Sequence, residues 1–149
     1  MSFDPSLGDR LIVVAIVDDE SLVRISLRRL CVAFGLGATA YGSAREFLEA
    51  LDDHVPLPDC LLLDIQMPEM TGLELQRHLT KLGIHVPTIV VTADDAPEAR
   101  ARCLAAGAVE YLRKPIGADE LLLAIERAVC GPRRPSNTPP RGATGAIVQ

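Results

Sequence analysis

The sequence predicts an α/β fold in which one parallel β-sheet is covered by helices on both faces. Apolar runs of strand length are continuous in Val, Ile and Leu instead of alternating with polar residues, as strands buried on both faces require. Segments of helical length separate these runs, and such an alternation implies right-handed crossovers. The length of 149 residues fits one domain, and with 3% aromatic residues its core must be aliphatic.

Five strands are expected from these runs. Three runs are strong, at 11–17, 60–63 and 88–91, and two weaker ones cover 38–41 and 108–112. In a parallel sheet the carboxyl ends of the strands meet at one edge, and ligands bind beyond that edge. The residues that follow each run are therefore the first candidates for a functional site.

The first helix is expected over 20–34. Gly35 follows it, and glycine readily adopts the left-handed conformation found at helix C-termini. Apolar residues recur in this segment at spacings of three and four, which is typical of an amphipathic helix. The row that we expect to face the core consists of Leu22, Ile25, Ser26, Leu30 and Phe34.

Capping signatures predict the second and third helices. Ser43 followed by Glu46 has the spacing of a capping box and opens a short helix. Thr71 and Glu74 repeat this spacing before a longer helix that ends at Gly83.

Two more helices complete the alternation. Asp94 or Asp95 precedes Pro97, a residue type favoured in the first helical turn, and Gly107 marks the end of that helix. The last helix is expected from about 118 to 129 because its apolar residues again recur with helical spacing.

The folded domain is expected over 8–130, preceded by an N-terminal extension at 1–7 and followed by a flexible tail at 131–149. The tail holds four Pro, three Gly and three Arg without an acidic residue, a composition typical of a linker. The formal net charge is -5 for the whole chain and becomes -8 when the three tail arginines are set aside. This acidity argues against direct nucleic acid binding.

The remaining composition favours a cytoplasmic protein without a membrane anchor. The N-terminus lacks the basic and apolar regions of a secretory signal, and no apolar run approaches the length of a membrane span. The four cysteines are widely spaced, without a Cys-x-x-Cys pair or zinc-ligand spacing. We therefore expect them to be small buried hydrophobic residues in a reducing compartment.

Three carboxylates directly follow two of the expected strands. Asp18 and Asp19 come after the first strand and Asp64 after the third, so a parallel sheet brings them together. Like charges held close repel each other unless a cation neutralises them. Mg²⁺ suits such a cluster, because it binds through one or two carboxylates and keeps positions open for water and phosphate oxygens. The sequence therefore predicts a Mg²⁺ site.

Thr92 and Lys114 follow the fourth and fifth strands at the same edge. An ammonium and a hydroxyl bind phosphoryl oxygens, and a metal beside a carboxylate makes phosphoryl transfer onto that carboxylate feasible. Taken singly, each residue has an ordinary explanation as a helix cap, a strand-end residue or a solvated charge. Jointly, these residues predict a site for a transient aspartyl phosphate on Asp64.

The segments that carry this site resemble the receiver domains of bacterial two-component response regulators, most closely the FixJ-like branch. The matching segments are VDDE at 17–20, LLLDIQMPEMTGLEL at 61–75, PTIVVTA at 87–93 and AGAVEYLRKPI at 106–116. The resemblance covers the chain from about residue 11 to 129, with every segment in the family's order. It implies a flavodoxin-like (βα)5 doubly wound parallel sheet with strand order 2-1-3-4-5.

The resemblance also implies the roles of individual residues. Asp64 would accept a phosphoryl group from a histidine kinase or a phosphotransfer protein, and Thr92 and Lys114 would bind that group. Mg²⁺ would be held by Asp18, Asp19, Asp64 and the backbone carbonyl of Gln66, with Asp19 as the more direct ligand.

The resemblance implies a conformational switch as well. Thr92 would move toward the phosphate, and Tyr111, at the aromatic switch position, would turn inward. The surface formed by the fourth helix, the fifth strand and the fifth helix would change and control a partner, with the protein acting as a monomer or a phosphorylation-dependent dimer. The bond between Lys114 and Pro115 is expected to be cis.

The sequence does not determine what the switch acts on. FixJ-like proteins usually carry a C-terminal helix-turn-helix domain, for which the 19 residues after Cys130 are too few. The chain is then either a stand-alone receiver that acts on a protein target, or the receiver and linker of a larger transcriptional regulator. The apolar loop around Met67, Pro68 and Met70 is either packing or part of a kinase-docking surface.

The alternative function is a phosphatase that hydrolyses phosphoesters through an aspartyl phosphate. Phosphatases of the haloacid dehalogenase type need a second Asp two residues after the nucleophile, as general acid and base. This chain has Gln66 there, which does not titrate. We therefore favour the signalling switch over the hydrolase.

Overall fold

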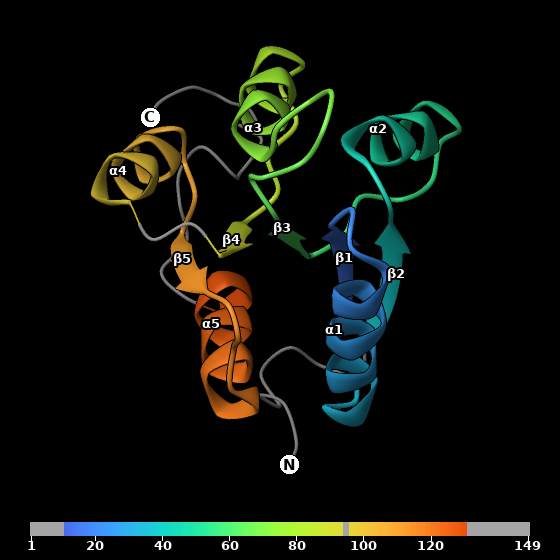
Figure 1. The fold of residues 1–149 in the computed structure, drawn as a ribbon. Coiled ribbons are helices and arrows are strands. Elements are labelled where there is room, and N and C mark those ends of the chain that lie inside the picture. The colour runs from blue at the N-terminus through green and yellow to red at the C-terminus, as the bar shows by residue number, and fades with distance from the viewer. Residues whose placement is uncertain (1–10, 94–95, 131–149) are drawn as a thin grey trace.

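The computed structural model describes residues 11–93 and 96–130 (Figure 1). The predicted extension at 1–7, the predicted tail at 131–149 and the candidate caps Asp94 and Asp95 lie outside the described residues. Strands and helices alternate strictly along the described chain. Their bounds are β1 (Val13–Val17), α1 (Ser21–Ala33), β2 (Gly37–Tyr41), α2 (Ala44–Asp52), β3 (Cys60–Leu63), α3 (Gly72–Lys81), β4 (Thr88–Thr92), α4 (Pro97–Ala105), β5 (Glu110–Arg113) and α5 (Ala118–Cys130).

The strands form one parallel sheet in the order β2-β1-β3-β4-β5, which confirms the flavodoxin-like order expected from the resemblance. The strand order changes direction between β1 and β3, and such a switch point is where open α/β sheets bind ligands. Val17 lies opposite Leu63, and Leu63 lies opposite Val90. The residues that follow β1 and β3 are therefore immediate neighbours at the carboxyl edge.

Helices cover both faces of the sheet, with α1 and α5 on one side and α2, α3 and α4 on the other (Figure 1). Alternate strand residues supply the two cores, because successive side chains point to opposite faces. Val14 and Ile16 pack with α1 and α5, whereas Ala15 and Val17 pack with α2 and α3. Every residue of β3 and β4 is buried, as their continuous apolar runs predict.

The predicted buried face of the first helix is wrong in part: Leu30 and Phe34 pack against the core, but Leu22, Ile25 and Ser26 are exposed. Leu22 is 77% exposed and Ile25 is 46% exposed, whereas Leu27 and Cys31 form the buried row of α1. The reason is that the segment carries more apolar residues than one helix face can bury, so spacing alone does not select the face. An apolar surface is left on the outer side of α1.

Capping is confirmed for two helices. The Ser43 hydroxyl accepts a hydrogen bond from the Glu46 backbone N–H at 3.1 Å. Thr71 and Glu74 form a complete capping box before α3, with bonds of 3.2 and 2.8 Å. In contrast, α4 starts after Ala96, which supplies no side-chain cap.

The predicted bounds shift by one or two residues in four strands; β2 begins one residue earlier, at Gly37, and β4 ends one residue later, at Thr92. β1 begins at Val13 because Leu11 is 58% exposed, outside the covered part of the sheet. β5 begins at Glu110 instead of residue 108, because the chain is still turning at Gly107, which has a φ of 107°. At the carboxyl edge β4 and β5 each extend one residue further than predicted, to Thr92 and Arg113.

The four cysteines are free thiols, and Cys31, Cys60 and Cys103 are buried as predicted. Burial raises the pKa of Cys31 to about 12 and also raises the pKa of Cys60. Within the described residues, no helix has both the length and the apolar character needed to cross a bilayer.

Candidate functional site

The site is built around two buried carboxylates at the switch point of the sheet. Asp18 follows β1 and Asp64 follows β3, and their side chains converge because the two strands are paired. The Asp64 backbone N–H donates to the Val17 carbonyl at 3.0 Å, which continues the pairing to the last strand residue. Asp18 is 1% exposed and Asp64 is 3% exposed. Two charges held so far from water need a compensating cation.

Lys114 supplies that positive charge. Its Nζ lies 2.8 Å from Asp18 Oδ2, 3.2 Å from Asp64 Oδ2 and 3.3 Å from Glu20 Oε1. The Lys114 backbone N–H donates to the Thr92 carbonyl at 2.8 Å, so β4 and β5 fix where the side chain starts. The Lys114–Pro115 bond is cis, as the resemblance implied. The single positive charge of Lys114 therefore neutralises the three carboxylates only in part.

The second oxygen of each buried carboxylate is held by the backbone. Asp18 Oδ1 accepts from the Glu20 N–H at 2.9 Å, and Asp64 Oδ1 accepts from the Gln66 N–H at 3.0 Å. Each carboxylate is thus fixed at both oxygens, one by the backbone two residues on and one by Lys114. The two side chains keep their orientation before any ligand arrives.

The pKa values of the site follow from burial and from the charge of Lys114. Burial raises the pKa of Asp18 and outweighs the hydrogen bond from Lys114, while the nearby Asp64 charge acts in the same direction as burial. Burial lowers the pKa of Lys114, but the hydrogen bond to Asp18 and the charges of both aspartates outweigh it, so the pKa is raised overall. Lys114 therefore keeps its proton at neutral pH.

A cluster of oxygen ligands suited to a hard divalent cation is present. One oxygen each from Asp18, Glu20 and Asp64 lies within 4.8 Å of the others. Asp19 is exposed and lies outside this group, so the structure does not bring together the full predicted set. Sequence reasoning missed Glu20, although VDDE presents a third acidic residue directly after the strand. Carboxylate oxygens around a lysine that only partly neutralises them fit Mg²⁺.

The side chains of Thr92 and Gln66 contact each other at the carboxyl edge. Thr92 is fully buried at the end of β4, and its hydroxyl donates to Gln66 Oε1 at 3.5 Å. The carbonyl oxygen of Gln66 is the predicted backbone ligand, while its side chain lies next to the threonine that was predicted to bind phosphate. The Gln66 side-chain amide therefore lies beside Thr92.

Tyr111 lies in β5, on the face that carries α4. It is 9% exposed and packs in a small cluster with Val90, Cys103 and Ala108. The Arg100 guanidinium lies over its ring, 5.9 Å from the centroid. The ring is therefore buried between β4 and α4 already, without any ligand at the carboxyl edge.

The sequence did not indicate a role for Gly72, and it left the role of Met67 open. Gly72 begins α3 so close to the preceding loop that a Cβ there would contact the Asp64 carbonyl oxygen and lie 2.8 Å from Ile65 Cα. Met67 is 6% exposed and belongs to the core under α2 and α3, so it is packing and not a docking surface. Both residues fix the loop that holds Asp64.

Known proteins are similar to this chain in sequence. Response regulator protein TodT of Pseudomonas putida is 37% identical over 134 residues, which are 89% of this chain and 58% of TodT. Nodulation protein W of Bradyrhizobium diazoefficiens is 38% identical over 119 residues, which are 78% of this chain and 50% of that protein. The chain therefore spans only about half the length of these curated relatives.

The solved structure of FixJ-N is 34% identical, with a TM-score of 0.75 over 84% of this chain and 98% of that chain. A family model described as the response regulator receiver domain matches residues 14–126, which include both buried aspartates, Thr92 and Lys114. The chain therefore belongs to the response regulator receiver domains, and it is a phosphorylation-dependent signalling switch.

Proposed function

We propose that Asp64 accepts a phosphoryl group from the phosphohistidine of a sensor histidine kinase or a phosphotransfer protein. The observation that carries this proposal is the convergence of Asp18, Asp64, Thr92 and Lys114 at the switch point, with Lys114 Nζ within 3.2 Å of both aspartates. A carboxylate fixed by hydrogen bonds at both oxygens is oriented for in-line attack on phosphorus.

Mg²⁺ is the proposed cofactor, held by Asp18, Asp64, the backbone carbonyl of Gln66 and a carboxylate from residue 19 or 20. The family resemblance assigns that last ligand to Asp19, whereas the observed cluster contains Glu20. Among the described residues Asp19 makes no hydrogen bond or ion pair, so its charge is not engaged by Lys114 and is available to a cation. When bound, Mg²⁺ screens the repulsion between the attacking carboxylate and the phosphoryl oxygens.

The chain's own residues supply the rest of the step. An Asp64 oxygen forms the new bond to phosphorus while the bond from phosphorus to the donor imidazole nitrogen breaks, and that nitrogen keeps the electron pair. Lys114 then pairs with a phosphoryl oxygen in place of a carboxylate oxygen, and the Thr92 hydroxyl donates to another. Thr92 has to leave its long 3.5 Å contact with Gln66 to do so.

This movement is the proposed origin of the output. Thr92 ends β4, which pairs with the strand that carries Tyr111, and Tyr111 packs against α4. A shift of the threonine toward the phosphate opens space behind it, into which the tyrosine ring settles more deeply. The surface of α4, β5 and α5 changes and controls a partner, either a separate protein or an output domain such as those that extend the relatives beyond this match.

The phosphoryl donor must approach Asp64 from the carboxyl edge. An apolar groove of about 450 Å³ borders the site there, between α1 and the turn after β5, lined by Leu22, Val23 and Ser26 together with Lys114 and Pro115. The exposed row of α1 therefore gives the donor protein an apolar surface beside the acceptor. We expect Leu22→Asp to slow phosphoryl transfer from a kinase without changing transfer from acetyl phosphate.

The decisive test uses acetyl phosphate with Mg²⁺ and intact-mass measurement. We expect the wild-type chain to gain one phosphoryl group, and Asp64→Asn to gain none. Equal labelling of both proteins would remove Asp64 from the role of acceptor. Measurement of the phosphate released in the same samples separates a switch from a phosphatase, because a switch turns over slowly and holds the group, whereas a phosphatase releases many equivalents of phosphate.

A further inference from the structure

The backbone carbonyl of Asp18 lies where the pairing of β1 with β2 stops. The Asp18 N–H still donates to the Tyr41 carbonyl at 3.2 Å. β2 ends at Tyr41, and the N–H of the following Gly42 donates to the Glu46 side chain at 2.9 Å. In a continued parallel ladder a later N–H of β2 would donate to the Asp18 carbonyl. A buried carbonyl is almost always hydrogen-bonded, so this one depends on a donor from another element.

Arg24 supplies that donor from near the start of α1. Its Nη1 donates to the Asp18 carbonyl oxygen at 2.8 Å, and the side chain is partly buried. A Cβ on Gly42 would lie 3.4 Å from the same Nη1, so the guanidinium also lies beside the turn after β2. A hydrogen bond from a charged donor is stronger than one between neutral groups. Arg24 therefore ties α1 to the segment that follows β1.

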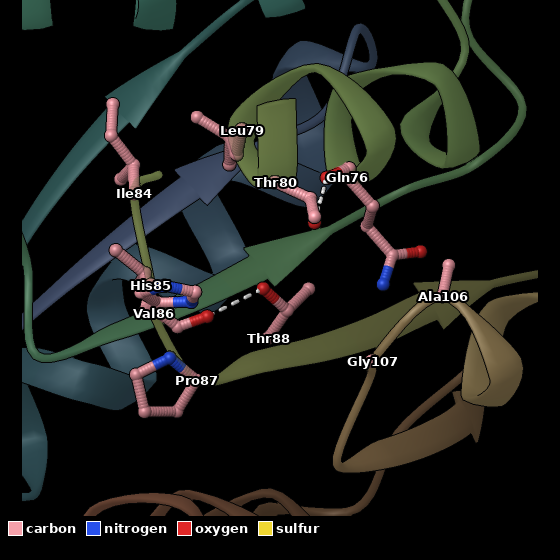
Figure 2. A pocket seen from close by; sticks show the side chains of 10 residues that line it. All are labelled: Gln76, Leu79, Thr80, Ile84, His85, Val86, Pro87, Thr88, Ala106 and Gly107. Atoms are coloured by element: carbon pink, nitrogen blue, oxygen red, sulfur yellow. Dashed lines mark hydrogen bonds between the residues drawn. The ribbon is translucent and has the colours of Figure 1, made fainter. Parts of the chain in front are cut away.

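A carbonyl at the opposite edge of the sheet is satisfied in a different way. Just before β4, the Val86 carbonyl accepts from the Thr88 hydroxyl at 3.0 Å, two residues further along the chain (Figure 2). Such a contact stabilises only its own turn. The contact of Arg24 spans six residues and joins a helix to the end of a strand. Its loss would therefore free the segment after β1 to move relative to α1.

The peptide that Arg24 holds leads directly to Asp19, the proposed Mg²⁺ ligand. The peptide unit is planar, so the Asp18 carbonyl, the Asp19 N–H and both Cα atoms share one plane. Fixing the carbonyl oxygen therefore fixes the point from which the Asp19 side chain starts. The Asp18 side chain has its own supports, the Glu20 N–H and Lys114. No described residue holds the Asp19 carboxylate, so its orientation depends on the backbone.

We propose that Arg24 is a positioning residue for the Mg²⁺ site: its hydrogen bond to the Asp18 carbonyl holds the peptide between Asp18 and Asp19 in the orientation that Mg²⁺ binding uses. The inference rests on the proposed function, because it concerns the same metal site. A pure charge effect would have the opposite sign. A cation near the carboxylates repels Mg²⁺, so removal of the Arg24 charge alone would raise the affinity for Mg²⁺.

The test is a Mg²⁺ titration of the full chain by amide NMR, with Arg24→Gln and Arg28→Gln as a matched pair. Arg28 lies one turn further along α1, and its Nε donates to the Ala38 carbonyl on β2 at 3.3 Å. Both variants remove one positive charge and one hydrogen bond to a backbone carbonyl. We expect Arg24→Gln to lower the affinity for Mg²⁺ about tenfold. Arg28→Gln should change it less than about twofold, because salt screens an exposed charge.

Two further measurements distinguish positioning from a general loss of stability. In the metal-free protein the Asp19 amide resonance should shift in Arg24→Gln and stay in place in Arg28→Gln. In the Asp19→Ala background, Arg24→Gln should lower the affinity by less than about twofold further, because two residues that act through one contact are not additive. If Arg24→Gln does not fold, Arg24→Lys takes its place. It keeps the charge on a shorter side chain and should lower the affinity relative to Arg28→Lys.

Three results would each overturn the positioning role while leaving Asp64 as the proposed acceptor. They are an unchanged or higher affinity for Mg²⁺ in the Arg24 variant, equal losses in the Arg24 and Arg28 variants, and full additivity with Asp19→Ala. Absence of Mg²⁺ binding by the wild type would overturn both this inference and the proposed metal site.

Discussion

Gly72 offers the sharpest test of how the fold positions Asp64. In Gly72→Ala the new methyl group would contact the Asp64 carbonyl oxygen and lie 2.8 Å from Ile65 Cα, 0.6 Å inside the 3.4 Å at which ordinary contact begins. Both neighbours are backbone atoms, which cannot rotate away as a side chain does. The loop that carries Asp64 and Gln66 must therefore move as a unit.

The size of the effect follows from this geometry. Overpacking a well-filled site costs about 1–3 kcal/mol, and we expect the upper end because the backbone has to shift. A loss of about 3 kcal/mol corresponds to a Tm lower by roughly 10 °C for a domain of this size. Misplacing a reacting group by about 1 Å slows its reaction up to about 100-fold, so phosphorylation of Asp64 should slow by at least about tenfold.

Thermal unfolding and the initial rate of labelling by acetyl phosphate measure the two effects on the same sample. Gly42→Ala is the matched control, because its nearest neighbours are side-chain atoms at 3.4 Å and its φ is not positive. We expect that variant to stay within about 1 kcal/mol of wild type and to accept phosphate normally. If Gly72→Ala has the same Tm and the same labelling rate as the wild type, this close approach does not position Asp64.

Three further predictions follow. Thr92→Ala should still accept a phosphoryl group but lose the spectral change of backbone amides that accompanies phosphorylation, and an unaltered amide response would rule out its switch role. Asp19→Ala should lower the affinity for Mg²⁺ at least about tenfold in an NMR titration, and Glu20→Gln should lower it less. The reverse order would assign the third carboxylate ligand to Glu20. At about pH 8.5 iodoacetamide should modify only the half-buried Cys130 of the native protein, since burial protects the other thiols and holds the pKa of Cys31 at about 12; two or more adducts by intact mass would contradict the described core.

The sequence predicted local structure correctly wherever the residue types of one segment determine it. Continuous apolar runs gave the buried strands, and two capping signatures gave helix starts that the hydrogen bonds confirm. The sequence did not predict correctly which face of α1 is buried, because Leu22 is exposed and Leu27 is buried. Burial there depends on which side the sheet lies, and helical spacing contains no such information when apolar residues occupy more than one face of the helix.

The sequence by itself determined the fold class and the residue types at the carboxyl edge, because the ends of β1, β3 and β4 are marked locally by a polar residue after an apolar run. Only the tertiary structure decided how those residues meet. The three contacts of Lys114, the presence of Glu20 instead of Asp19 in the carboxylate cluster, and the approach of Gly72 to the Asp64 backbone all depend on distances between separate elements. The Gln76 side-chain oxygen, which has no hydrogen-bond partner among the described residues, is of the same kind, because it is buried only once α3 and α4 have packed around the amide.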